Sequence, residues 1–106
     1  MSGDLPRVKR RYLLVRLVPA GVQVAPEELR QQIVEELLKI GGWVSLAEAG
    51  LSIRRYERGC EFLLRCSLRS LPIVLLALTM VRRVGGENVR LDVLRVGGTI
   101  KGLKRG

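Results

Sequence analysis

The sequence predicts an α+β domain in which a four-stranded antiparallel sheet carries two helices on one face. Alternation of apolar and polar residues, typical of half-buried strands, occurs in residues 10–18, 51–57, 60–67 and 89–96. Apolar residues with helical spacing occur in residues 26–40 and 71–83. The element order is therefore β-α-β-β-α-β, and a chain of 106 residues has room for one domain. We expect residues 1–8 to be a basic flexible N-terminus and residues 9–106 to form the domain.

The first strand, residues 10–18, is predicted to be apolar on one face and mixed on the other. The apolar face carries Leu13, Val15 and Leu17, and the mixed face carries Tyr12, Leu14 and Arg16. A helix should begin at Pro26, because proline lacks the N–H that a first turn leaves unpaired, and Glu27 and Glu28 meet the positive helix end.

The first helix should place one apolar stripe on the core. The stripe consists of Leu29, Ile33, Val34, Leu37 and Ile40, and the polar face of Glu28, Gln32, Glu35, Glu36 and Lys39. Gly41 and Gly42 are expected to end this helix. Residues 43–50 then form a loop or a short helical turn, with Trp43 filling the core at the helix exit or, alternatively, stacking on a base.

Residues 51–57 and 60–67 read as a hairpin with a two-residue turn at Arg58 and Gly59. Closing the hairpin there pairs Glu57 with Cys60, Arg55 with Phe62, Ile53 with Leu64 and Leu51 with Cys66. The two cysteines lie six residues apart on one strand, roughly 20 Å at the usual strand rise, so they cannot form a disulfide within the chain. We expect reduced thiols in a reducing compartment.

The second helix has more apolar residues than one face requires. Ser70 suits an N-cap, Pro72 suits the first turn, and the helix should run to about Arg83. One stripe serves the core: Leu71, Val74, Leu75, Leu78 and Val81. Nearly opposite lie Ile73, Leu76, Ala77 and Met80, which we expect to contact another subunit unless the helix is buried on all sides.

Residues 84–88 predict a turn, and residues 89–96 the last strand, with Val89, Leu91 and Val93 alternating against Arg90, Asp92 and Leu94. With right-handed crossovers the order gives the ferredoxin-like sandwich, which RNA-recognition motifs also use. The open face then displays Tyr12, Arg16, Arg54, Tyr56, Leu63, Arg65, Arg90 and Asp92. Only the two tyrosines could stack on bases, and residues 60–67 lack the RNA-recognition octapeptide. The alternative is a face covered by a partner or a terminal segment.

Positive charge is concentrated at the two ends of the sequence. The chain has 19 Lys and Arg, 10 Asp and Glu and a net charge of +9, which favours polyanionic partners. Residues 1–11 carry four cations against one carboxylate, a balance of +3, and residues 97–106 add another +3. Because the first and last strands should pair antiparallel, we expect Lys9, Arg10, Arg11 and Tyr12 to meet the C-terminal segment.

The C-terminal segment has the residue types that bind phosphate. Gly97 and Gly98 can adopt positive φ and turn backbone N–H groups outward together. If Thr99 caps a short basic helix, Lys101, Lys104 and Arg105 share one face while Ile100 and Leu103 pack inward. The alternative is a frayed, merely soluble terminus.

Several classes of protein are disfavoured by the sequence. With no histidine and no Cys-x-x-Cys spacing, zinc sites and imidazole-based triads are excluded. The longest apolar run, residues 71–81, is too short to span a bilayer, so we expect no membrane partner. The basic start continues into a strand-like segment rather than a cleavage site, so we expect a cytoplasmic protein.

Three segments together resemble the ribonuclease P and MRP protein subunit family known as Pop-five, in its archaeal form. They are residues 9–14 at the first strand, 76–81 on the second helix and 96–101 at the end of the last strand. The resemblance covers residues 9–105, and it rests on the order and spacing of these segments rather than on one motif.

The resemblance implies a non-catalytic, RNA-binding subunit of the ribonucleoprotein that removes 5′ leaders from precursor tRNA. The RNA subunit and its magnesium ions then perform the cleavage, and the protein binds no cofactor of its own. The implied partners are ribonuclease P RNA, a TIM-barrel-like ribonuclease P protein subunit and a second copy of the chain. A dimeric ferredoxin-like module that senses a small ligand is the alternative, because the fold alone does not determine function.

Overall fold

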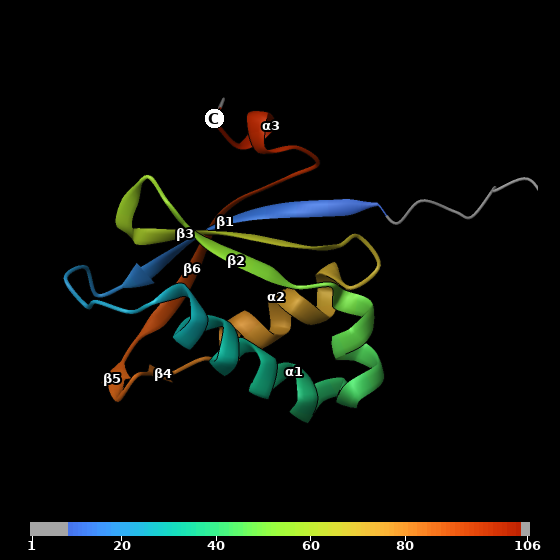
Figure 1. Ribbon diagram of the computed structural model, residues 1–106, viewed down its shortest axis with the longest axis horizontal. Helices are drawn as coiled ribbons and strands as arrows, with labels where there is room; N and C mark the ends of the chain where they lie inside the picture. Colours follow the sequence, from blue (N-terminus) through green and yellow to red (C-terminus); the bar gives the residue numbers. More distant parts are fainter. Residues whose placement is uncertain (1–8, 105–106) are drawn as a thin grey trace, which may run out of the picture.

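The computed structural model describes residues 9–104, except for the side chains of residues 58, 59 and 104. Residues 1–8, predicted to be a flexible N-terminus, lie outside this description. Figure 1 shows the elements in chain order: β1 (Arg10–Val18), α1 (Pro26–Ala49), β2 (Ser52–Tyr56), β3 (Arg58–Ser67), α2 (Leu71–Met80), β4 (Arg83–Val84), β5 (Glu87–Asn88), β6 (Arg90–Gly97) and α3 (Ile100–Lys104).

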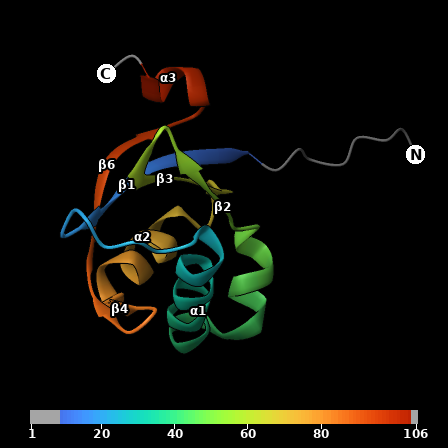
Figure 2. The ribbon, with the colours of Figure 1, turned by 60° about the vertical axis from the view of Figure 1, so that its left-hand side comes forward.

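The principal sheet has four strands in the order β2-β3-β1-β6, and every neighbouring pair is antiparallel. Helices α1 and α2 both lie on one side of this sheet (Figures 1 and 2). This is the ferredoxin-like arrangement that the sequence predicts, and the predicted fold class is confirmed. The first strand also has the predicted bounds.

The main core lies between the sheet and the two long helices. Strand alternation directs Leu13, Val15 and Leu17 of β1 into it, and all three are fully buried. They pack with side chains from β3, α1 and α2: Phe62, Leu64, Leu29, Ile33, Leu37, Val74 and Leu78. The core is therefore largely aliphatic, with Phe62 as its one fully buried aromatic ring among the described residues.

The short helix α3 lies on the opposite side of the sheet from α1 and α2 (Figures 1 and 2). Its Leu103 is 2% exposed and forms a second buried cluster with Leu14 of β1 and Leu63 of β3. Tyr12, Tyr56 and Ile100 pack around this cluster. The face predicted to be open is thus partly covered by the terminal segment, the alternative that the sequence left open.

Helix α1 is longer than predicted. Gly42 leaves helical geometry at φ 72° and ψ −169°, but the helix resumes and continues to Ala49, before Gly50 at φ 54°. The predicted break at Gly41 and Gly42 is present as this kink, and residues 43–49 form the helical alternative that the sequence left open beside a loop.

Trp43 does not fill the core. Trp43 is 75% exposed, whereas Ile73 of α2 lies beside Gly41 at the kink. A Cβ placed on Gly41 would lie only 2.9 Å from Ile73 Cδ1, so the helices approach each other closely there. Glu36, which was predicted on the polar face of the helix, is instead buried. It accepts a hydrogen bond from Gln32 Nε2 (3.3 Å) and forms an ion pair with Lys39.

The β2–β3 hairpin has the predicted register away from its tip: Arg55 opposes Phe62 and Ile53 opposes Leu64. The turn is tighter than predicted, because Tyr56 pairs with Arg58 after a bulge and Glu57 takes a φ of 31°. The predicted pairing of Glu57 with Cys60 is therefore wrong.

Helix α2 ends at Met80 instead of near Arg83, and Val81 is already extended. Ser70 is at the N-cap position but makes no side-chain cap. Its backbone N–H instead donates to Ser67 Oγ at 3.2 Å.

The predicted turn after α2 is the small β4–β5 hairpin, with Gly85 and Gly86 at φ 58° and 83°. The last strand, β6, begins at Arg90 and contains a bulge. Val93 opposes Val15 and Arg95 opposes Leu14, so Leu94 is the extra residue.

Candidate nucleic-acid interface

Two cationic segments meet where the start of β1 lies beside the end of β6. Because β1 and β6 are antiparallel, Tyr12 lies opposite Gly97, and Arg11 lies beside Gly98. A Cβ placed on Gly98 would be 3.6 Å from Arg11 Nη1. The predicted juxtaposition of the two segments is confirmed, and their contact with RNA remains a prediction.

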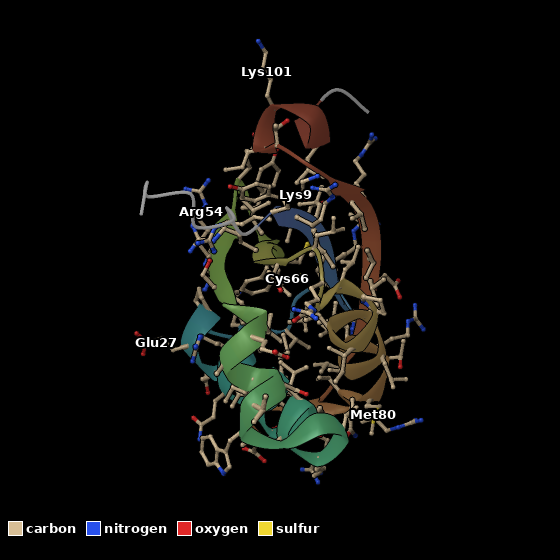
Figure 3. All side chains as sticks on the ribbon, turned by 90° about the vertical axis from the view of Figure 1, so that its right-hand side faces the viewer. Lys9, Glu27, Arg54, Cys66, Met80 and Lys101 are labelled. Atoms are coloured by element: carbon tan, nitrogen blue, oxygen red, sulfur yellow. The ribbon has the colours of Figure 1, made fainter. Side chains whose placement is uncertain are left out.

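Helix α3 places Lys101 above the sheet. Thr99 Oγ1 accepts a hydrogen bond from Gly102 N at 3.0 Å, which is the predicted N-cap. Because Leu103 is buried and Ile100 half-buried, α3 is fixed to the sheet and Lys101 is exposed. Figure 3 shows Lys101 extending away from the rest of the molecule. The Lys104 side chain and Arg105 lie outside the described part of the chain.

Gly97 and Gly98 do not form the predicted phosphate-binding backbone turn, since neither has a positive φ. Gly97 instead allows close packing: a Cβ there would be 3.3 Å from Leu103 Cδ2 and 3.5 Å from the Thr99 carbonyl oxygen. The glycine therefore lets α3 fold back onto the sheet.

Arg10 reaches across the sheet toward the start of β2, whereas Arg11 lies beside Gly98. Arg10 Nη1 lies 3.7 Å from a Cβ placed on Gly50, just beyond the end of α1. Arg95, which sequence reasoning missed, is exposed and opposes Leu14 on the α3 side of the sheet. The bulge at Leu94 determines that facing, and no local sequence signal predicts it. We define the cationic patch as Lys9, Arg11, Arg95 and Lys101.

Carboxylates are segregated from the cationic patch. Residues 9–26 and 93–106 contain none, whereas α1 carries five of the chain's ten. Helix α1 lies on the far side of the sheet from α3 (Figure 2). The ion pairs described, Arg16–Glu61, Lys39–Glu36 and Arg90–Asp92, involve none of the patch residues. The side of the molecule around α3 is therefore the one suited to a polyanion.

Three side chains of the sheet have raised pKa values, so each keeps its ordinary protonation state near neutral pH. Desolvation, with Glu57 and Glu61 adding to it, raises the pKa of Tyr56, so its phenol stays neutral. The hydrogen bond to Asp92 raises the pKa of Arg90. Burial raises the pKa of the Cys66 thiol to about 11, which makes it a poor nucleophile. Both cysteines are free thiols.

The predicted partner surface on α2 is only partly exposed. Leu76 is 50% exposed and Met80 38% exposed, whereas Ile73 packs against the main core. Ala77 is fully buried, so its placement at an interface is wrong: the helix sits so that Val74, Ala77 and Leu78 all face the core. On neighbouring β6, Val93 and Val96 are also exposed. We define the apolar surface as Leu76, Met80, Val93 and Val96.

The described residues contain no cluster of three or more His, Cys, Asp or Glu side chains that could hold a metal ion. No helix in residues 9–104 has the length and apolar content needed to cross a membrane.

Comparison with known proteins relates this fold to ribonuclease P. The chain matches the model of the Rpp14/Pop5 family over residues 11–106. "Ribonuclease P protein component 2" of Archaeoglobus fulgidus is 34% identical over 107 residues, covering 99% of this chain and 95% of that protein. The protein of the same name from Pyrococcus furiosus is 28% identical, covering 93% of this chain and 82% of its own length.

A solved structure shares the fold. A chain in the cryo-EM structure of yeast ribonuclease MRP superposes with a TM-score of 0.69 at 8% sequence identity, covering 91% of this chain and 79% of that one. The family match covers nearly all of the sequence, and the predicted resemblance is confirmed. This chain belongs to the Rpp14/Pop5 family and is similar to its archaeal ribonuclease P subunits.

Proposed function

We propose that this chain is a non-catalytic RNA-binding subunit of ribonuclease P, which supports the RNA-catalysed removal of 5′ leaders from precursor tRNA. The observation that carries this proposal is the cationic patch. Two segments from opposite ends of the sequence meet there, and residues 9–26 and 93–106 contain no carboxylate.

The patch suits the backbone of RNA better than a small ligand. Its cations come from the start of β1, the end of β6 and α3, so they form a surface instead of enclosing a pocket. Lysine and arginine on such a surface neutralise phosphates and release counterions, independent of the base sequence. The role of the protein is then to hold the RNA in its active fold, while magnesium ions bound to the RNA act in the cleavage.

The apolar surface supports a place in a larger assembly. Leu76 and Met80 are exposed on α2, although a monomer gains nothing from leaving such side chains in water. We propose that this surface contacts protein, either a TIM-barrel-like ribonuclease P subunit or a second copy of the chain. RNA and protein would then occupy different sides, because α2 and α3 lie on opposite faces of the sheet (Figure 1).

The double variant Arg11→Gln/Lys101→Gln tests the RNA contact. A patch that touches about 4 to 6 phosphates gives log K against log salt a slope of roughly −3 to −5. Removing two of those charges should flatten the slope by roughly 1.5 to 2 and weaken binding to ribonuclease P RNA. Leader cleavage by the reconstituted particle should fall when protein and magnesium are limiting.

The matched control is Lys39→Gln/Arg82→Gln, which removes the same charge from residues outside the patch. Lys39 makes one exposed ion pair with Glu36, so its loss should cost little stability. Equal salt slopes for the two double variants would show that only net charge attracts the RNA, and the patch would then have no specific role.

A further inference from the structure

A groove lies between α3 and the sheet strands β1, β2 and β3. Its lining residues come from β1, β2, β3 and α3, and it encloses about 400 Å³, within the range of roughly 300–1,000 Å³ usual for small-molecule sites. Tyr12 opposes Arg65, and Arg65 opposes Ser52, so these three side chains form one row across the sheet. In the next row Arg54 opposes Leu63. The groove is lined by Tyr12, Ser52, Ile53, Arg54, Leu63, Arg65 and Ile100.

Arg65 in this groove has a donor without an acceptor. Its Nε is buried, and none of the described residues accepts a hydrogen bond from it. A buried donor that stays unpaired costs free energy, and the cost is larger for a charged group. The guanidinium fork presents its N–H groups in the geometry that a phosphate or carboxylate accepts. An anion in the groove would satisfy this donor.

The rest of the lining selects the kind of anion. Arg54 supplies a second, exposed guanidinium, and no carboxylate lines the groove. Tyr12 supplies an aromatic ring, and Ile100 and Leu63 supply apolar surface. Aromatic rings beside cations are the elements on which unpaired bases and their phosphates bind. The chemistry that fits is a nucleotide, with one anionic and one flat apolar part.

We propose that this groove holds one nucleotide of single-stranded RNA, with its phosphate on Arg54 and Arg65 and its base against Tyr12 and Ile100. The proposal rests on the RNA-binding function above and adds a site to it. An RNA strand is favoured over a free nucleotide because exposed Lys101 follows Ile100 on α3, and Arg10, two residues before Tyr12 on β1, reaches Gly50 just before β2. A strand leaving the groove therefore meets further cations at once.

The arginine side-chain Nε–H resonances of the isolated chain, observed by NMR, provide the readout. Three probes separate the sources of phosphate: a five-nucleotide oligoribonucleotide, AMP and inorganic phosphate. The oligoribonucleotide should shift the Arg65 Nε–H resonance and the backbone signals of Tyr12 and Ser52. AMP and inorganic phosphate should bind at least tenfold more weakly, because they lack the contacts beyond the groove.

Three charge-removing variants identify the site. Arg65→Gln and Arg54→Gln should each weaken oligoribonucleotide binding about tenfold or more, as expected for a charge-assisted hydrogen bond. Arg82→Gln, an exposed arginine outside the groove and the patch, should weaken it less than threefold. Arg65→Lys keeps the charge but loses the fork, so it should retain only part of the affinity. Because Arg54 is exposed, Arg54→Gln should fold and still tests the groove if Arg65→Gln fails to fold.

The outcomes distinguish this proposal from the proposed function. Equal losses for Arg54→Gln and Arg82→Gln would overturn the groove while the cationic patch could still bind RNA. AMP binding as tight as that of the oligoribonucleotide would overturn the choice of an RNA strand. If the groove variants weaken binding and Arg11→Gln/Lys101→Gln does not, the groove stands and the role of the patch fails.

Discussion

Phe62 shows how one residue fixes the position of several elements. It is fully buried on β3, opposite Val15 of β1 and Arg55 of β2. The Arg55 guanidinium carbon lies 5.4 Å from the ring centroid, a distance at which a cation is attracted to the aromatic face. Arg55 also donates to the Val24 carbonyl oxygen at 3.0 Å. Arg55 thus connects the Phe62 ring and the sheet to the segment that leads into α1.

We expect Phe62→Ala to lower the free energy of unfolding by roughly 3 to 5 kcal/mol, because it leaves a cavity in the main core. Arg54→Ala, on the exposed face of the adjacent strand, should change it by no more than about 0.5 kcal/mol. Urea unfolding followed by circular dichroism measures both. Equal, small losses would contradict the burial of Phe62.

Residue facing was predictable where alternation is regular and unpredictable where packing decides. Leu13, Val15 and Leu17 follow from the period of two, and all are buried. Ala77 and Trp43 do not follow from any local pattern. The rotation of α2 over the sheet buries Ala77, and the close approach of Ile73 to Gly41 leaves Trp43 outside.

At the scale of elements, α3 is the one that links the fold to the candidate site. It has only five residues, too few for a stable isolated helix, so its structure depends on the Thr99 cap and on the burial of Leu103. The sequence contains both features, and it predicted the capped helix correctly. The surface on which α3 packs was not predictable, because it depends on the close contact between Gly97 and Leu103.

Leu103→Ala should detach α3 without unfolding the domain. Leu103 belongs to a small cluster with Leu14 and Leu63, separate from the main core. Its truncation should therefore destabilise α3 and leave the rest of the domain folded. Hydrogen exchange at the backbone amides of residues 100–104 should become fast, while the unfolding midpoint changes much less than in Phe62→Ala. RNA affinity should also fall, because Lys101 would no longer be held above the sheet. A loss of global stability as large as that of Phe62→Ala would place α3 within the main cooperative unit.

At the scale of the whole molecule, charge and apolar surface are sorted onto different sides. Helix α1 carries five carboxylates and lies on the far side of the sheet from α3, the groove lies beside α3, and the cationic patch lies where the start of β1 meets the end of β6. The apolar surface lies on α2 and the edge strand β6. In Figure 3 Met80 lies at the opposite end of the view from Lys101. RNA on one side would therefore leave α2 free to contact protein.

Charge sorting was predictable in part. The antiparallel pairing of the first and last strands follows from the element order, and it places the start of β1 beside the end of β6 as expected. The groove was not predictable, because it exists only where α3 covers part of the sheet and leaves Arg65 beneath it. Likewise, the exposure of Val93 and Val96 depends on how far α2 extends over the edge strand.

The double variant Leu76→Lys/Met80→Lys tests the apolar surface. Both side chains are already exposed to solvent, at 50% and 38%, so two lysines there should leave the domain folded. If the surface mediates association, the wild-type chain should self-associate or bind the TIM-barrel-like subunit, and the double variant should remain monomeric. Light scattering reports mass, and circular dichroism reports the fold in the same samples.

Ala77→Lys is the matched control on the same helix. Its position is fully buried, so an uncompensated charge there should unfold the domain, not merely release a partner. Collapse of the double variant as well would move Leu76 and Met80 into the core. A folded double variant with undiminished association would instead show that the partner binds elsewhere. Only loss of association with the fold retained assigns the contact to α2, and with it a protein-binding surface on the opposite face of the sheet from α3.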